Sequence, residues 1–338
     1  MKVKFYGTRG SLPSGLIATE VEDKIVKAIM LTHNLISNPD DEESVRDVVR
    51  NMAFPLRGTY GGDTTCCVVR CGEVIIVLDM GSGLRRFGKE ILQAMFSKKG
   101  TKIYFLMSHI HWDHIQGFPF FAPLFVPREF LPNNRLTFFG GTSWKGKLEE
   151  VLRGQMDPPM FPVEWGKVSA EGPEMDFITI FDRFRTEFLS DTLDGLGYVK
   201  VVARRLNHPN ETYGWRIEHN GQIFVFASDT EPYDGGPDPA LLELAKGAHL
   251  LYLDCQFTRN QYLGHDGSPS RRGWGHGYLE WCVKVAQEAG VEHLLLGHHD
   301  PAASDEQIFS MEQQSHKLTT EVPCQVRAAY DGLEVNLD

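Results

Sequence analysis

The chain has 338 residues, of which 42% are hydrophobic and 23% are charged, and its formal net charge is −11. This composition is typical of a globular protein with a sizeable core and excludes a disordered chain. The acidic balance disfavours a general binder of nucleic-acid backbones, because the long-range field would repel a polyanion. The sequence contains no run of about eighteen uncharged apolar residues, so we expect no membrane span.

The cysteines and the first residues bear on the cellular compartment. None of the six cysteines forms a Cys-x-x-Cys pair, and several lie in apolar runs where a free thiol behaves as a small hydrophobic group. The N-terminus has neither the apolar region nor the cleavage site of a secretory signal. We therefore expect a soluble, cytoplasmic protein with reduced cysteines.

The N-terminal part of the chain predicts a strand, a helical segment and a hairpin. Residues 2–6 predict a short strand. Residues 19–37 predict a helix because their apolar residues recur at helical spacing, and residues 41–52 predict a second helix that Asp40–Asp41 could cap. Residues 65–70 and 74–78 are β-rich runs separated by a short turn containing glycine, which predicts a hairpin. A helix is then expected up to about residue 97, followed by a strand at 102–107.

The C-terminal part alternates strands and helices. Its clearest hairpin joins residues 215–218 and 223–226 through Asn220-Gly221, a type I′ turn signal. The elements expected after it are a helix at 239–246, a strand at 249–254, a loop at 255–275, a helix at 277–289 and a strand at 292–296. The alternation favours an α/β fold, whereas the hairpins argue against a purely parallel sheet. Together they predict a mixed-sheet sandwich with helices outside.

Four side chains that can bind metals lie within six residues, directly after the strand expected at 102–107. They are His109, His111, Asp113 and His114. Imidazole nitrogen and carboxylate oxygen suit zinc, and also manganese or iron. Loops at strand ends commonly present functional groups, so this cluster predicts a metal site.

One segment cannot complete such a site, so further ligands should come from other strand ends. His208 follows the strand expected at 199–206, Asp229 follows a strand ending at 227, and His298 follows a strand ending at 296. Each residue alone is equally compatible with a structural role. Their shared position after strands makes all three candidate ligands.

These motifs resemble the metallo-β-lactamase superfamily, in the branch with ribonuclease Z and phosphodiesterase-like proteins. The matching segments are His109-Ile-His111-Trp-Asp113-His114, Asn207-His208-Pro209, Ser228-Asp229-Thr230, Gly297-His298, Gly7-Thr8-Arg9-Gly10-Ser11, Tyr60-Gly61-Gly62-Asp63-Thr64 and Leu78-Asp79-Met80-Gly81-Ser82-Gly83. The resemblance covers residues 1–15 and about 57–335. It implies an α/β fold, the αββα four-layer sandwich of two mixed β-sheets flanked by helices, as one domain over 1–338 with a helical insertion at about 16–57.

The resemblance also implies a ligand set for two divalent metal ions, with zinc expected and manganese or iron as alternatives. His109, His111 and His208 would bind one ion, and Asp113, His114 and His298 would bind the other. Asp229 would bridge the two ions, and Asp79 would be a buried carboxylate that orients a ligand.

His276 is the candidate proton donor. Gly273-Trp274-Gly275-His276-Gly277 resembles a family motif that carries a histidine which is not a ligand, although the family has a hydroxyl residue where this chain has Gly277. The alternatives are that His265, in the preceding loop, donates the proton, or that His276 only begins a helix.

The function that the resemblance implies is metal-dependent hydrolysis of a small phosphodiester such as a cyclic nucleotide. A hydroxide bridging the metals would attack phosphorus, with Asp113 and Asp229 orienting it and His276 protonating the leaving oxygen. The alternatives are a ribonuclease Z-like nuclease acting on RNA, which the acidic charge disfavours, a hydrolase of a non-phosphate ester or lactone, and a metal-bound sensor without turnover. The insertion at 16–57 could be a lid, the contact of a homodimer, or surface decoration.

Overall fold

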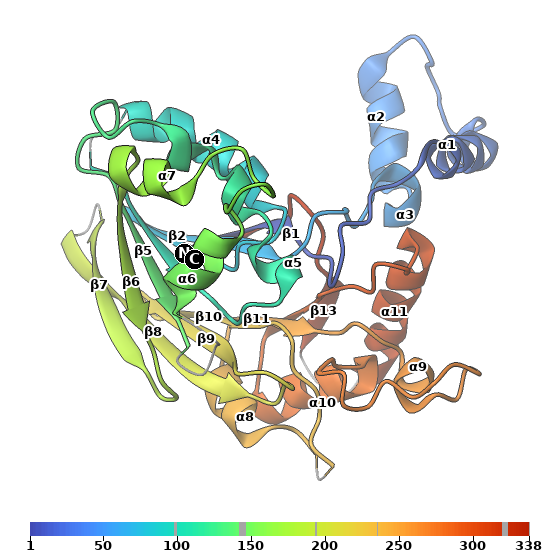
Figure 1. The fold of residues 1–338 in the computed structure, drawn as a ribbon. Coiled ribbons are helices and arrows are strands. Elements are labelled where there is room, and N and C mark those ends of the chain that lie inside the picture. Colours follow the sequence, from blue (N-terminus) through green and yellow to red (C-terminus); the bar gives the residue numbers. More distant parts are fainter. Residues whose placement is uncertain (98–99, 142–146, 193–194, 235, 320–323, 338) are drawn as a thin grey trace.

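Two mixed β-sheets of seven strands pack face to face in the computed structural model, with helices on their outer surfaces (Figure 1). The structure describes residues 1–97, 100–141, 147–192, 195–234, 236–319 and 324–337. The arrangement is the αββα sandwich that the motifs imply, so the expected fold class is confirmed. Within the described residues, every helix is too short or too polar to cross a membrane.

The first sheet has the order β14-β1-β2-β3-β4-β5-β6. Its strands are β1 (Lys2–Gly7), β2 (Cys66–Cys71), β3 (Val74–Leu78), β4 (Lys102–Leu106), β5 (Arg135–Gly140), β6 (Glu174–Thr179) and β14 (Glu334–Asn336). Strands β2 and β3 form the predicted antiparallel hairpin, whereas β3 to β6 run parallel. All five residues of β3 are buried, as expected for a strand that is covered on both faces.

The second sheet has the order β13-β12-β11-β10-β9-β8-β7. Its strands are β7 (Arg185–Thr192), β8 (Gly195–Leu206), β9 (Thr212–His219), β10 (Gln222–Ala227), β11 (Leu250–Asp254), β12 (His293–Gly297) and β13 (Gln325–Ala328). The hairpin between β9 and β10 is confirmed, and Asn220 and Gly221 have the positive φ angles, 50° and 77°, of a type I′ turn. Strands β10 to β13 are parallel, so their carboxyl ends meet at one edge.

The core between the sheets contains buried aromatic side chains and a hydrogen bond that joins the two sheets. Phe226 and Tyr252 stack with ring centroids 5.1 Å apart, and both are fully buried. The buried Trp215 donates a hydrogen bond from its indole N–H to the carbonyl of Met107, across the two sheets. Met107 lies two residues before His109, so this bond fixes the start of the segment that carries the predicted metal ligands.

The outer faces are covered by helices that bury one apolar side. Leu84, Phe87 and Ile91 pack against the first sheet, and Leu241, Cys282 and Val285 pack against the second. The helices are α4 (Leu84–Ser97), α5 (Trp112–Ile115), α6 (Leu148–Gly154), α7 (Trp165–Glu171), α8 (Pro239–Ala245), α9 (Arg259–Leu263), α10 (Leu279–Ala289) and α11 (Asp305–Leu318), with 3-10 turns at Phe118–Phe120 and Ala122–Phe125.

The expectation of a loop throughout 255–275 was wrong, because α9 lies within it. This helix has only five residues, too few to produce a helical period in the sequence. It is defined instead by a capping box, in which the Thr258 hydroxyl accepts from the Gln261 N–H and the Gln261 side chain accepts from the Thr258 N–H.

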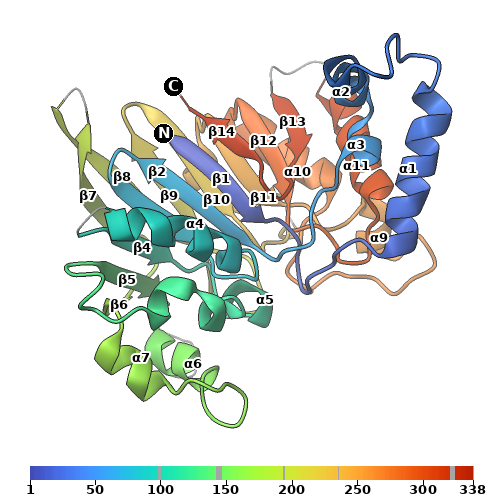
Figure 2. The ribbon, with the colours of Figure 1, turned by 90° about the horizontal axis from the view of Figure 1, so that it is seen from above.

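The segment at 16–57 forms three helices beside α11 at one end of the sandwich (Figures 1 and 2). They are α1 (Ala18–Thr32), α2 (Glu42–Asn51) and α3 (Phe54–Arg57). Helix α1 ends at Thr32 rather than continuing to residue 37 as predicted. Its periodic apolar residues, among them Ile25 and Ile29, are exposed, so no packing against the body favours a longer helix.

Candidate metal centre

The predicted metal ligands converge because four strands end at the same edge of the sandwich. The segment from His109 to His114 follows β4, His208 follows β8, Asp229 follows β10, and His298 follows β12. Strand β8 is antiparallel to β9, which is antiparallel to β10, so β8 and β10 run in the same direction and end at the same edge of the sheet. The topology therefore joins residues that are up to 189 positions apart in the sequence.

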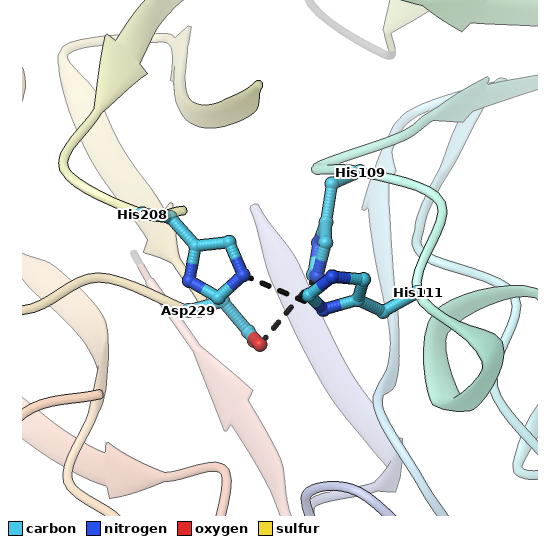
Figure 3. A group of neighbouring side chains, drawn as sticks. All are labelled: His109, His111, His208 and Asp229. Atoms are coloured by element: carbon cyan, nitrogen blue, oxygen red, sulfur yellow. Dashed lines mark hydrogen bonds and ion pairs between the residues drawn. The ribbon is translucent and has the colours of Figure 1, made fainter. Parts of the chain in front are cut away.

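The first group consists of His109, His111, His208 and Asp229, whose side chains point toward one another in Figure 3. The ring centroid of His109 lies 4.4 Å from that of His111 and 4.9 Å from that of His208. His208 Nε2 is 3.4 Å from His111 Nδ1, and His109 Nε2 is 3.6 Å from an Asp229 oxygen. One cation could contact all four residues.

The second group consists of Asp113, His114 and His298. Asp113 Oδ2 lies 3.2 Å from His114 Nε2 and 3.2 Å from His298 Nε2, and the two nitrogens are 3.3 Å apart. The backbone N–H of Ser11, in the first loop of the chain, donates to Asp113 Oδ2 at 2.8 Å and holds that carboxylate in place.

Asp229 lies between the two groups and presents one oxygen to each. Its Oδ1 is 3.1 Å from both His114 Nε2 and His298 Nε2, whereas its Oδ2 faces His109. Its side chain is almost completely buried. A carboxylate with this orientation can bind two cations at once.

The residues present fit divalent metal ions. His109 Nε2 is buried and has no hydrogen-bond partner among the described residues. The paired imidazole nitrogens face one another at 3.3 and 3.4 Å, an arrangement that neutral rings satisfy best by donating lone pairs to a shared cation. The donor atoms are nitrogen and oxygen without sulfur, which suits zinc, manganese or iron.

The electrostatics of the first group also suit metal binding. Burial lowers the pKa of His109 well below its usual range, and burial likewise lowers the pKa of His111 and His208. Burial therefore favours the neutral form of these rings, which is the form that binds metals. Burial alone would raise the pKa of Asp229, but the surrounding imidazoles outweigh it and hold that pKa well below its usual range.

A buried carboxylate behind the ligands fixes the orientation of His114. Asp79 Oδ1 accepts from the Ser108 N–H at 2.7 Å, and Asp79 Oδ2 accepts from the Ser108 hydroxyl at 2.7 Å. The same Oδ2 lies 2.8 Å from His114 Nδ1, which leaves Nε2 of that ring directed at the centre. The position matches the role that the sequence suggests for Asp79.

His276 lies beside the ligands without belonging to either group of the predicted set. Its ring stacks on that of His298 at 5.0 Å, and its Nδ1 is 2.7 Å from Asp254 Oδ2. Burial alone would lower the pKa of His276, but the Asp254 carboxylate outweighs it and raises this pKa to about 9. By contrast, His265 is exposed after the end of α9.

Asp254 is the site residue that the sequence analysis missed. It is fully buried at the end of β11 and lies with Asp229, His276 and His298 in a third group of close ligand-type side chains. The signal was present, because Asp254 follows an apolar run just as Asp229 follows another. It escaped notice because its segment, Leu253-Asp254-Cys255, is not among the segments that resemble the superfamily.

A family model described as a beta-lactamase superfamily domain matches residues 103–299, more than half of the chain. The chain belongs to this superfamily. An uncharacterized protein of Mycobacterium leprae is 29% identical over 247 residues, covering 70% of each chain. A ribonuclease Z of Limosilactobacillus fermentum is 23% identical over 248 residues, covering 60% of this chain and 70% of its own.

Solved structures show the same fold over the whole chain. The metallo-beta-lactamase fold protein YhfI from Bacillus subtilis superposes with a TM-score of 0.60 at 15% identity, covering 99% of this chain and 98% of its own. A diphosphatase from the PhnP family superposes with a TM-score of 0.58 at 14% identity, covering 100% of this chain and 98% of its own. The short form of human tRNase Z superposes with a TM-score of 0.54 at 14% identity, and the match covers 100% of both chains.

We predict that Asp79→Asn weakens metal binding roughly 10- to 100-fold, because an amide cannot hold His114 in the required tautomer as a carboxylate does. The measurement is a titration of the metal-free protein with zinc against a chelating indicator. Asp176→Asn, which changes an exposed carboxylate paired with Arg135, is the matched control. Unchanged zinc affinity in Asp79→Asn would rule out this role.

Proposed function

We propose that the protein is a phosphodiesterase that uses two divalent metal ions and acts on a small phosphodiester, with a 3′,5′-cyclic nucleotide as the lead substrate. The observation that carries the proposal is the position of Asp229, with one oxygen toward each histidine group and the His276–Asp254 pair alongside. This arrangement supports the proposal, because cleavage of a phosphate ester by two cations calls for a nearby proton donor, the role we assign to His276.

In this mechanism the chain supplies ligands, orientation and a proton. When bound, divalent ions at such a site lower the pKa of water and stabilise charge on a phosphoryl group. Asp113 and Asp229 accept hydrogen bonds from the attacking water and orient it toward phosphorus. The His276 imidazolium, held by Asp254 through Nδ1, donates its Nε2 proton to the departing oxygen.

Two observations favour a phosphodiester over the other esters that a metal pair can attack. Relatives of the chain include proteins named ribonuclease Z, and a diphosphatase shares the fold. The cationic form of His276, favoured by its pKa of about 9, also suits an anionic substrate and a leaving alkoxide that needs a proton. The net charge of −11 favours a small substrate over a long RNA.

Cleavage of RNA in the manner of ribonuclease Z is the second candidate, because the relatives of that name support it. A ribonuclease Z of Brevibacillus brevis is 41% identical, although over only 93 residues and 27% of this chain. A labelled RNA with a 3′ trailer distinguishes this candidate from the lead.

The test of the lead is a panel of 3′,5′-cyclic nucleotides incubated with protein loaded with zinc or manganese. We expect a 5′- or 3′-nucleotide product, and we expect His111→Ala to lose at least about 10³-fold in turnover because one cation loses a ligand. Circular dichroism should show that the variant stays folded. Turnover by His111→Ala with normal metal content would contradict the assignment, and inactive wild-type protein with full metal occupancy would favour RNA or a non-phosphate ester.

The roles of His276 and His265 can be distinguished by how the activity of each variant depends on the leaving group of the substrate. We predict that His276→Ala lowers kcat for a cyclic nucleotide by about 10²- to 10⁴-fold. The loss should be much smaller for a p-nitrophenyl phosphodiester, because p-nitrophenolate departs without a proton. His265→Ala, an exposed histidine from the same region, should remain close to wild type. Equal losses on both substrates, or a larger loss in His265→Ala, would exclude His276 as the donor.

A further inference from the structure

Trp274 is an exposed aromatic residue in a loop that directly contacts the metal centre. Its exposed fraction is 56%, although it is only two residues from His276. Gly273 and Gly275 on either side have φ angles of 81° and 90°, a region that residues with a Cβ rarely adopt. The two glycines let the chain turn sharply on both sides of this one side chain.

The loop is anchored at several points, so the position of Trp274 is well defined. The N–H groups of Gly273 and Gly275 both donate to the Glu231 carboxylate, at 3.0 and 3.2 Å. The Gly275 carbonyl lies 3.0 Å from His208 Nδ1 and accepts a hydrogen bond from its N–H. A Cβ on Gly275 would be 2.0 Å from that nitrogen, which shows how closely the loop approaches His208.

One side of the Trp274 ring is supported from within the protein. Phe257 meets it edge to face, with centroids 6.4 Å apart and planes at 75°, and the Arg271 guanidinium lies 5.0 Å over the Phe257 ring. Exposing a large indole to water is unfavourable, so a supported and exposed tryptophan beside a reaction centre is well suited to bind a flat ligand group.

We propose that Trp274 is the platform on which the base of a nucleotide substrate stacks. This proposal rests on the proposed phosphodiesterase function and narrows it to phosphodiesters that carry a nucleobase. Stacking on an indole tolerates any base, so the platform selects nucleotides over base-free phosphate esters and discriminates little between adenine and guanine. The metal centre then engages the phosphate, and the loop connects the two subsites.

The test compares binding of adenosine 5′-monophosphate and ribose 5-phosphate by calorimetry, on the zinc-loaded wild-type protein and on Trp274→Ala and Trp274→Phe. We expect Trp274→Ala to weaken nucleotide binding by roughly five- to a hundredfold and to leave ribose 5-phosphate binding unchanged. Trp274→Phe should retain most of the affinity. Phe130→Ala, which removes an exposed aromatic before β5 at the opposite edge, is the control.

The kinetic counterpart is a rise in KM for cyclic nucleotides in Trp274→Ala with kcat changed less than about twofold. Wild-type protein that binds the nucleotide no better than ribose 5-phosphate, or a variant that weakens both equally, would overturn the platform. Base-dependent binding that is lost in Trp274→Ala, without any hydrolysis by wild-type protein, would support the platform and refute the phosphodiesterase instead.

A separate observation concerns α1, which presents apolar residues to solvent and polar ones to the body. Ile17, Val21, Ile25 and Ile29, spaced by four, have exposed fractions of 42–63%. Lys24, by contrast, faces inward, where it donates to the Gly58 carbonyl and pairs with Asp305. None of the ten residues of α2 is buried either, although an isolated helix of that length is marginal in water.

We infer that a second copy of this chain covers the row of exposed apolar residues Ile17, Val21, Ile25 and Ile29, here called the α1 ridge, in a two-fold dimer. Ridges of spacing four pack into the grooves between the corresponding ridges of an identical helix, and a two-fold contact covers the same apolar residues on both copies. The exposed apolar residues offer on the order of several hundred Å² per copy, close to the roughly 800 Å² per partner of a stable interface. Residues 17–52 carry eight acidic and four basic side chains, which disfavours an anionic membrane as the partner.

The test is light scattering of the full metal-loaded chain at about 50 μM, a concentration at which an interface of this size should be populated. Wild-type protein and Met160→Glu, which alters an exposed apolar residue elsewhere, should be dimers, and Ile25→Glu should be a monomer with unchanged melting temperature. A monomeric wild-type protein would overturn the inference, as would a dimeric Ile25→Glu. Binding of a wild-type monomer to phosphatidylglycerol vesicles would assign the ridge to membranes.

Discussion

The buried Asp229 carboxylate is the point on which the geometry of the centre depends. It has one oxygen toward His109 and the other between His114 and His298, and it is shielded from water. An isolated buried carboxylate is costly, and so is a cluster of buried imidazoles with nitrogens facing one another. The two become compatible when cations neutralise the carboxylate and accept the nitrogen lone pairs. Metal binding would therefore account for both the buried carboxylate and the facing nitrogens.

The backbone at the site also adopts unfavourable conformations. Asp79, Asp229 and His298 all have positive φ angles, of 60°, 53° and 52°, although none is glycine. Each such residue costs on the order of 1 kcal/mol or more, and it persists only where the surroundings determine it. Here the surroundings are the paired strands on both sides of β3, β10 and β12, and contacts such as the hydrogen bond from the His298 N–H to the Tyr252 hydroxyl at 2.9 Å. The rigid sandwich thus holds side-chain directions that the local sequence would not adopt alone.

The difference between local sequence patterns and tertiary contacts explains what the sequence could predict. The hairpins and the His109–His114 cluster are local patterns, and the fold class followed from them together with the family motifs. The grouping of His208, Asp229 and His298 could be expected because each follows an apolar run. Asp254 also follows an apolar run, but its pairing with His276, 22 residues away at 2.7 Å, is a tertiary contact that the local sequence does not reveal. The early end of α1 was equally hidden, since helical periodicity does not reveal whether an apolar face has a partner.

The segment from Gly273 to Gly277 also accounts for the departure from the family pattern at its last position. A Cβ on Gly277 would lie 2.4 Å from the Asp254 carbonyl and 2.7 Å from the Trp281 ring, so a hydroxyl residue does not fit without movement of β11 or α10. The close approach brings His276 against the Asp254 carboxylate. The carbonyl of Gly275, two residues before Gly277, orients His208. One short segment therefore sets both the orientation of a candidate ligand and the position of the candidate proton donor. Changes in its backbone should consequently affect metal affinity and proton transfer together, whereas a change confined to the outward Trp274 side chain should affect neither.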